Sequence, residues 1–217
     1  MNVRTWIIAG AVLIGVATPG WAEHPTGTEH PKATEHPKAT EHPAGTDAGQ
    51  QAMMEAWAKA AAPGPEHEAM ASMAGMWDAQ VKNFMDPAAP PMESKGTAEF
   101  AMELGGRYMV QRFHGEMMGQ SFEGLGYDSF DNITKTYRSI WMDSMSTAIS
   151  VMTGKADPAT RTITYAGSMN DAVSGTPIPM ETVLTFVDKD HQKMEMRQPG
   201  PDGKMVKTME ILYSRKK

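Results

Sequence analysis

Five residues in the second half of the chain combine aromatic surface with a few polar groups, as sites for small organic ligands usually do. They are Tyr108, Arg112, His114, Tyr137 and Trp141. Residues two apart on a strand share a face, so Tyr108, Arg112 and His114 form one set, and Tyr137 and Trp141 another. If both faces point into a protein interior, these side chains line a cavity, and we predict that they bind its ligand.

A buried Arg112 and His114 would need partners, because burying a polar group without a hydrogen bond costs free energy. One partner is a carboxylate from Glu99, Glu116 or Asp143. The other is an anionic group of a ligand. These residues also allow a different hypothesis about function, in which the protein is an enzyme that uses Arg112, His114 and one of these carboxylates.

Recognisable catalytic motifs are missing. The chain has no GxSxG nucleophile elbow, HExxH zinc motif, P-loop or GxGxxG turn. Outside an N-terminal repeat, the remaining histidines besides His114 are His67, beside a helix start, and His191, in a polar turn, and both are expected to be exposed. We therefore expect a binding protein with no cofactor rather than an enzyme.

Metal binding is the second class of function that the residue types allow. Methionine is abundant, with 21 residues, and Met142-x-x-Met145 and Met194-x-Met196 have the spacing of thioether ligands for Cu(I). The same side chains also suit an apolar core. A Glu-His-Pro hexad repeat adds four histidines, His24, His30, His36 and His42.

In a polyproline II chain, histidines six residues apart are separated by about 19 Å. They cannot share an ion there, so only weak binding of Zn, Ni or Cu is expected and no preformed metal site. The repeat also has no aliphatic residue larger than Ala. We predict that residues 23–47 are a disordered linker.

The N-terminus has the three-part pattern of a secretory signal. An apolar run over residues 6–17 follows Arg4, and the small residues Gly20 and Ala22 occupy the positions that define cleavage. The run is shorter than the roughly 20 residues that span a bilayer. We predict that residues 1–22 are a signal peptide cleaved after Ala22. The protein is then periplasmic or secreted, with no stable membrane anchor.

Composition narrows the possible partners and stabilising bonds. The chain has no cysteine, which excludes disulfides and thiolate sites, and its net charge is −6. A mildly acidic chain does not favour nucleic acid or anionic membranes as partners. Its oligomeric state is not indicated.

Residues 48–74 are expected to form a helical lead-in. Good helix formers fill residues 48–62 after Asp47, a plausible N-cap, and a Pro-Gly-Pro sequence ends the segment. A second short helix is expected over residues 66–73. The first helix has an apolar face that includes Trp57, and we expect this face to pack on the following domain.

Residues 75–217 alternate apolar and polar side chains in short segments separated by Gly, Pro, Asn and Asp turns. This pattern is typical of antiparallel strands with one wet face. The short connections allow only hairpins between sequence neighbours, and a sheet of about nine or ten strands leaves two exposed edges unless it closes. We predict an all-β, up-and-down antiparallel barrel. A two-sheet sandwich is the alternative.

Several segments resemble an uncharacterised bacterial family, the domain of unknown function DUF1579. They include GEMMGQSFEGLGYD at residues 115–128, WMDSMST at 141–147, ADPATRTITY at 156–165 and MEILYSRK at 209–216. The resemblance covers about residues 70–217 and implies a fold without implying an activity.

A second resemblance is to lipocalin-like barrels, in which a Gly-x-Trp opens the first strand and a basic residue of the last strand packs across the Trp. Gly75-x-Trp77 and Arg215 occupy these places here. The resemblance implies a cation–π contact between Arg215 and Trp77 that seals one end of the barrel.

Small barrels either fill their interior or leave room for one ligand. Our leading hypothesis is therefore non-enzymatic binding of a small, largely apolar ligand. Metal binding through the His repeat and the methionines, and a structural or partner-binding barrel with a filled core, are the alternatives.

Overall fold

The structure is a computed structural model that describes residues 47–84, 89–171 and 174–217. The predicted signal peptide and most of the predicted linker therefore lie outside the described residues. Two helices, α1 (Asp47–Ala61) and α2 (Pro65–Ala71), precede ten strands. The strands are β1 (Gly75–Asn83), β2 (Met92–Glu103), β3 (Tyr108–Met117), β4 (Gln120–Asp131), β5 (Thr136–Asp143), β6 (Ser150–Asp157), β7 (Thr162–Asn170), β8 (Pro177–Phe186), β9 (His191–Pro199) and β10 (Met205–Arg215).

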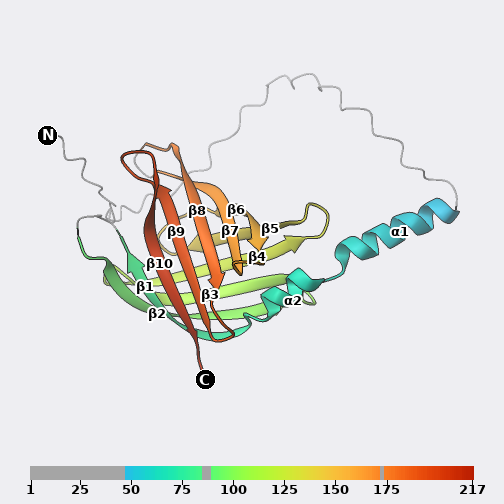
Figure 1. Ribbon diagram of the computed structural model, residues 1–217, viewed down its shortest axis with the longest axis horizontal. Helices are drawn as coiled ribbons and strands as arrows, with labels where there is room; N and C mark the ends of the chain where they lie inside the picture. The colour runs from blue at the N-terminus through green and yellow to red at the C-terminus, as the bar shows by residue number, and fades with distance from the viewer. Residues whose placement is uncertain (1–46, 85–88, 172–173) are drawn as a thin grey trace, which may run out of the picture. The chain divides into compact units, whose positions relative to one another are not determined.

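The strands form one closed up-and-down barrel. Each strand pairs antiparallel with its neighbours in sequence, and β1 also pairs with β10, which closes the sheet. Figure 1 shows β8, β9 and β10 crossing over β2 to β4, as opposite walls of a barrel do. The barrel prediction is confirmed over the sandwich alternative, with ten strands.

The predicted turns fall between strands as expected. The Gly105-Gly106 turn joins β2 to β3, and Met118-Gly119 joins β3 to β4. Both residues of the second turn have positive φ, 55° at Met118 and 77° at Gly119. This is the geometry of a two-residue hairpin turn that matches the twist of its strands.

The end of the barrel where β1 begins is packed with buried side chains. Trp77, Phe100, Phe130 and Ile163 are all buried there. Helix α2 contacts β3 and β4 near this end, and its Met70 joins the same core. We call this end the closed end.

His67 differs from its predicted exposure, because it is 4% exposed. Its ring lies edge-on to Phe130, with 6.1 Å between ring centroids, and its Nδ1 accepts a hydrogen bond from the Gly64 N–H at 3.1 Å. His67 thus secures the start of α2 against the barrel. His191 is exposed as predicted and lies 2.9 Å from Asp188.

The prediction that α1 packs through Trp57 is wrong. Helix α1 has no buried residue, and Trp57 is 65% exposed. The chain instead contacts the barrel at the C-terminal end of this helix. Asn132 donates to the carbonyls of Ala60 and Ala62, and Arg107 donates to the carbonyl of Ala61.

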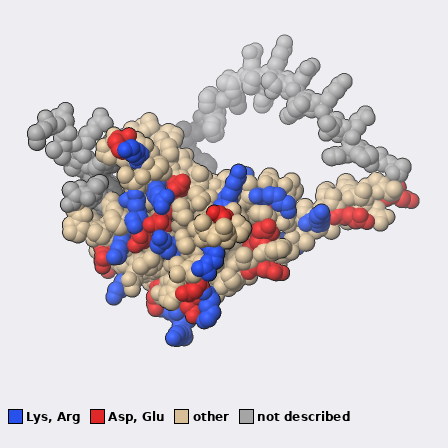
Figure 2. All heavy atoms as spheres, viewed as in Figure 1, with Lys and Arg blue, Asp and Glu red and all other residues tan. Residues whose placement is uncertain are grey.

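The outer face of β8, β9 and β10 carries charges of both signs. Lys207 and Arg197 both contact Glu195, and Lys207 also contacts Glu210 at 2.6 Å. Figure 2 shows acidic and basic side chains interspersed on the face that it views. Within the described ranges, no helix is long and apolar enough to cross a membrane.

Candidate functional site

A buried carboxyl group lies at mid-height inside the barrel. Asp128 of β4 is directly opposite Met109 of β3 and Ser139 of β5, which places it on the inward face. The hydroxyl groups of Ser139 and of Tyr165, from β7, hydrogen-bond to its side chain. Three strands therefore bring polar atoms together inside the barrel.

Burial dominates the electrostatics of this cluster. It raises the pKa of Asp128 to about 6, against the lowering effect of the hydrogen bonds from Ser139 and Tyr165. The pKa of Tyr165 lies well above its usual value, because the ring is buried beside this carboxyl. Tyr165 therefore stays protonated and can act as a hydrogen-bond donor.

A second polar pair lies beside the first. The amide of Gln111, on the inward face of β3, donates to the hydroxyl oxygen of Tyr213 on β10 at 3.2 Å. Burial raises the pKa of Tyr213 to about 12, and Asp128 adds to this shift. We call Gln111, Asp128, Ser139, Tyr165 and Tyr213 the interior polar cluster.

Beyond this cluster, away from the closed end, inward side chains remain partly exposed. Trp141, Met196 and Met209 pack against the core but are only half-buried. Asp128 itself is also partly exposed, although protein surrounds it. Phe113 and Phe122 are also buried in this half, with their ring centroids 5.8 Å apart, so it is partly filled. The partial exposure of the inward Asp128 and Trp141 shows where the interior stays open to solvent.

Two glycines shape this half of the barrel. Gly126 is directly opposite Trp141, and Gly124 is opposite Asp143. At these two inward positions β4 therefore has no side chain that would contact the indole. A Cβ at Gly124 would overlap the six-membered ring of Trp141. The indole therefore lies against the wall of the barrel, and its Nε1 donates to Asp143 at 3.0 Å.

The predicted inward orientation of Tyr108, Arg112 and His114 is wrong. Met109, Gln111 and Phe113 are the inward residues of β3, since Phe113 pairs with the inward Ala98. Tyr108 is 41% exposed, and the side chains of Arg112 and His114 are 45% and 65% exposed.

The two basic residues form exposed ion pairs instead of the expected buried ones. Arg112 lies 3.4 Å from Glu103, and His114 lies 3.8 Å from Glu123. Both faces of this strand are rich in apolar residues, so the periodicity alone could not decide which one faces inward.

Tyr137 and Trp141 do lie on the inward face of β5, but at different heights. Tyr137 is buried toward the closed end against Phe130, with ring centroids 4.9 Å apart, and Trp141 lines the partly open half. The sequence reasoning missed Asp128. The detectable signal was a charged residue at an inward position of β4, between Gly126 and Phe130.

The two methionine pairs do not lie on the same side of the sheet. Met194 and Met196 pack against the core, whereas Met142 is paired with Leu125 on the outer face and Met145 is exposed. Among the described residues, no group of three or more His, Cys, Asp or Glu side chains could hold a metal ion.

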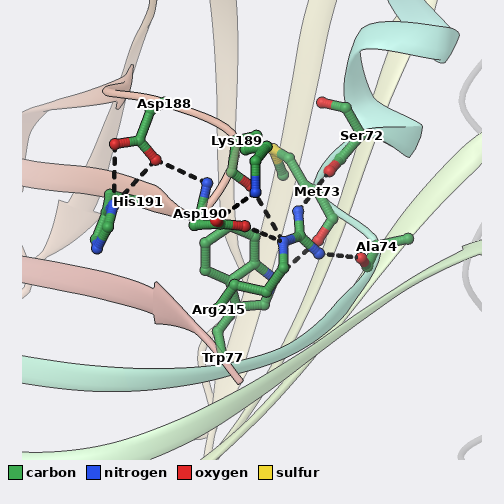
Figure 3. A network of polar contacts seen from close by, with 9 residues as sticks. All are labelled: Ser72, Met73, Ala74, Trp77, Asp188, Lys189, Asp190, His191 and Arg215. Carbon is green, nitrogen blue, oxygen red and sulfur yellow. Dashed lines mark hydrogen bonds and ion pairs between the residues drawn. The ribbon is translucent and has the colours of Figure 1, made fainter. Parts of the chain in front are cut away.

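A surface hollow of about 640 Å³ lies at the closed end, where Phe186 and Gln192 form part of its lining. Its charged groups are engaged with one another. Arg215 donates to the carbonyls of Ser72, Ala74 and Lys189, as Figure 3 shows in part. We assign this network to closing the barrel rather than to binding.

A closed antiparallel barrel sealed by an arginine over a tryptophan is a lipocalin-like barrel. The guanidinium carbon of Arg215 lies 4.2 Å from the centroid of the Trp77 ring, as the resemblance implied. The chain belongs to the family described as "Protein of unknown function (DUF1579)", whose profile matches residues 62–215.

Comparison with solved structures finds similar chains, including the following two. Rv2717c from M. tuberculosis has 13% identity and a TM-score of 0.49, with 72% of this chain and all (100%) of that chain covered. The S-type phycobiliprotein lyase CPES from Guillardia theta also has 13% identity, with a TM-score of 0.48 and coverage of 70% and 93%. Comparison with the curated proteins finds no match.

Proposed function

We propose that the protein binds a small, largely apolar ligand in the half of the barrel between the interior polar cluster and Trp141. The observation that carries this proposal is that inward side chains beside the interior polar cluster stay partly exposed. They include the apolar Met196 and Met209 and the polar Asp128, whereas Trp77, Phe100 and Phe130 are buried at the closed end. Apolar walls with a few polar groups are the usual composition of a small-ligand site.

The chemistry of the walls supports an adaptable apolar site. Met196 and Met209 are flexible, polarizable side chains that fit varied apolar shapes. The inward glycines at positions 124 and 126 let the Trp141 ring lie against the sheet, which leaves the centre of the barrel free of that indole.

The N-terminal signal pattern gives this binding function a location. We propose that the protein acts outside the cytoplasm, after cleavage following Ala22. The chain has no cysteine and so forms no disulfide, and the closed barrel leaves no unpaired strand edge at which other chains could pair.

The test is titration with N-phenyl-1-naphthylamine, a neutral apolar probe whose fluorescence rises in apolar surroundings. We expect saturable binding to the native protein and at least a tenfold loss of affinity in Met196→Trp, which fills the proposed site. The matched control is Leu212→Trp, on the outer face of β10, where the residue is already exposed.

Circular dichroism and thermal unfolding establish that both variants are folded. An unchanged affinity in Met196→Trp would place the probe elsewhere. Absence of saturable binding to the native protein would favour the filled, partner-binding barrel.

A further inference from the structure

The barrel interior contains carboxyl groups without a cationic partner. Across the described strands, the inward positions hold Asp128 and Asp143, and Arg215 at the closed end is their only Lys, Arg or His. Asp143 accepts hydrogen bonds from Trp141 Nε1 and from the Met145 N–H, each at 3.0 Å. Asp128 lies deeper, and its side chain accepts hydrogen bonds from the hydroxyls of Ser139 and Tyr165.

Asp128 therefore keeps unused capacity to accept hydrogen bonds. A carboxylate offers about four acceptor sites, and the hydroxyls of Ser139 and Tyr165 take up two of them. The side chain lies on the inward face of β4 and is partly exposed. A ligand that enters the partly open half would meet Asp128 at the inner limit of the site.

We propose that the ligand carries an amino group at one end of an apolar body, and that this end binds Asp128 as an ammonium ion. The inference rests on the proposed function, since it names the class of ligand for the same site. An ammonium group donates hydrogen bonds and supplies the charge that the interior lacks, and both contributions are strong where water is excluded. The methionines and Trp141 contact the apolar body.

The same arrangement discriminates against acidic amphiphiles. A fatty-acid carboxylate at this depth would face Asp128, and among the described strands Asp143 is the only other inward charged side chain in this half. Two like charges in a low-dielectric interior repel strongly. A neutral alcohol could donate one hydrogen bond but would leave the charge of Asp128 uncompensated.

The experiment compares decylamine, decanol and decanoic acid as competitors of N-phenyl-1-naphthylamine. At about pH 8 decylamine is protonated, and decanoic acid and the Asp128 side chain are both ionised. We expect decylamine to displace the probe at a concentration at least tenfold lower than decanol, with decanoic acid the weakest. In Asp128→Asn, decylamine and decanol should become equivalent while the probe still binds.

The matched control is Glu123→Gln, which removes the same charge from the same strand on its exposed outer face. It should keep the full preference for the amine. Equal displacement by decylamine and decanol in the native protein would overturn the inference, as would a preference that survives Asp128→Asn. If the native protein binds no probe, the proposed function fails first and the inference falls with it.

Discussion

Arg215 covers the indole of Trp77 and binds the end of the helix that precedes it. The guanidinium carbon lies 4.2 Å from the ring centroid, and the two residues are directly opposite in β10 and β1 (Figure 3). The side chain of Arg215 donates to the carbonyls of Ser72 and Ala74, and Trp77 Nε1 donates to that of Met73 at 2.8 Å. Three consecutive carbonyls after α2 are thus satisfied by one stacked pair.

This pairing makes the stability of the closed end depend on both residues together. Trp77 is completely buried, so Trp77→Ala should lower the free energy of unfolding by about 3–5 kcal/mol. Arg215→Ala should cost less, because the arginine side chain is partly exposed. Denaturant unfolding of the two single variants and of the double variant measures these changes.

The double variant should lose less than the sum of the single losses, because each substitution already removes the contact between the two side chains. Arg215→Lys serves as a further comparison, since lysine keeps the charge but cannot form the planar fork that reaches two carbonyls. Strictly additive losses would mean that the stacked pair does not form.

Asp128 should make the stability fall as pH rises. Its pKa in the folded protein is about 6, above the value of about 3.9 in an unfolded chain. Its contribution is therefore fully present below about pH 4 and is lost as pH rises through about 6. We expect Asp128→Asn to gain on the order of 2–3 kcal/mol relative to the native protein between about pH 4 and pH 8.

Urea unfolding of both proteins across this range measures the difference directly. The comparison removes the opposite contributions of surface carboxyls such as Asp188 and Asp190, whose pKa values are lowered by their hydrogen bonds. A difference that does not change with pH would show that Asp128 is not buried as an acid.

Gly124 should be essential to the position of Trp141. In Gly124→Ala the new methyl group would overlap the indole, and such overpacking typically costs about 1–3 kcal/mol. Adding Trp141→Ala should restore part of that stability, because it removes the clash. Thermal unfolding of the three variants tests this, and a double variant no better than Gly124→Ala would contradict the packing.

Export is tested at the N-terminus. The signal pattern predicts that the mature protein begins at Glu23, and Ala22→Asp should block cleavage because the site needs a small residue there. N-terminal sequencing of protein recovered from a cell fractionation measures both. Recovery of protein that begins at Met1 from the cytoplasm would contradict the proposed export.

The barrel was predictable because its signals are local. Alternation over Trp77, Ala79 and Val81 fixes the inward face of β1, and turns such as Gly105-Gly106 force hairpins between neighbours. Closure follows from the number of short strands, and the contact between Trp77 and Arg215 followed from a family resemblance.

The site was only partly predictable because it depends on which face of each strand turns inward. On β3, Tyr108 and Met109 are both apolar enough to face a core, and only the pairing with β2 decides between them. Asp128 breaks the rule that inward positions are apolar, so its role depends on the hydroxyls that β5 and β7 bring to it. Trp57 shows the converse, since an apolar helix face need not find a surface to pack on.

The most direct test of the binding account is native mass spectrometry of untagged protein released gently from its own cells. We predict a species heavier than the polypeptide by the mass of one small organic molecule, and its loss in Met196→Trp but not in Leu212→Trp. A native protein that carries only its polypeptide mass, and that binds none of the added apolar amine, would contradict the account.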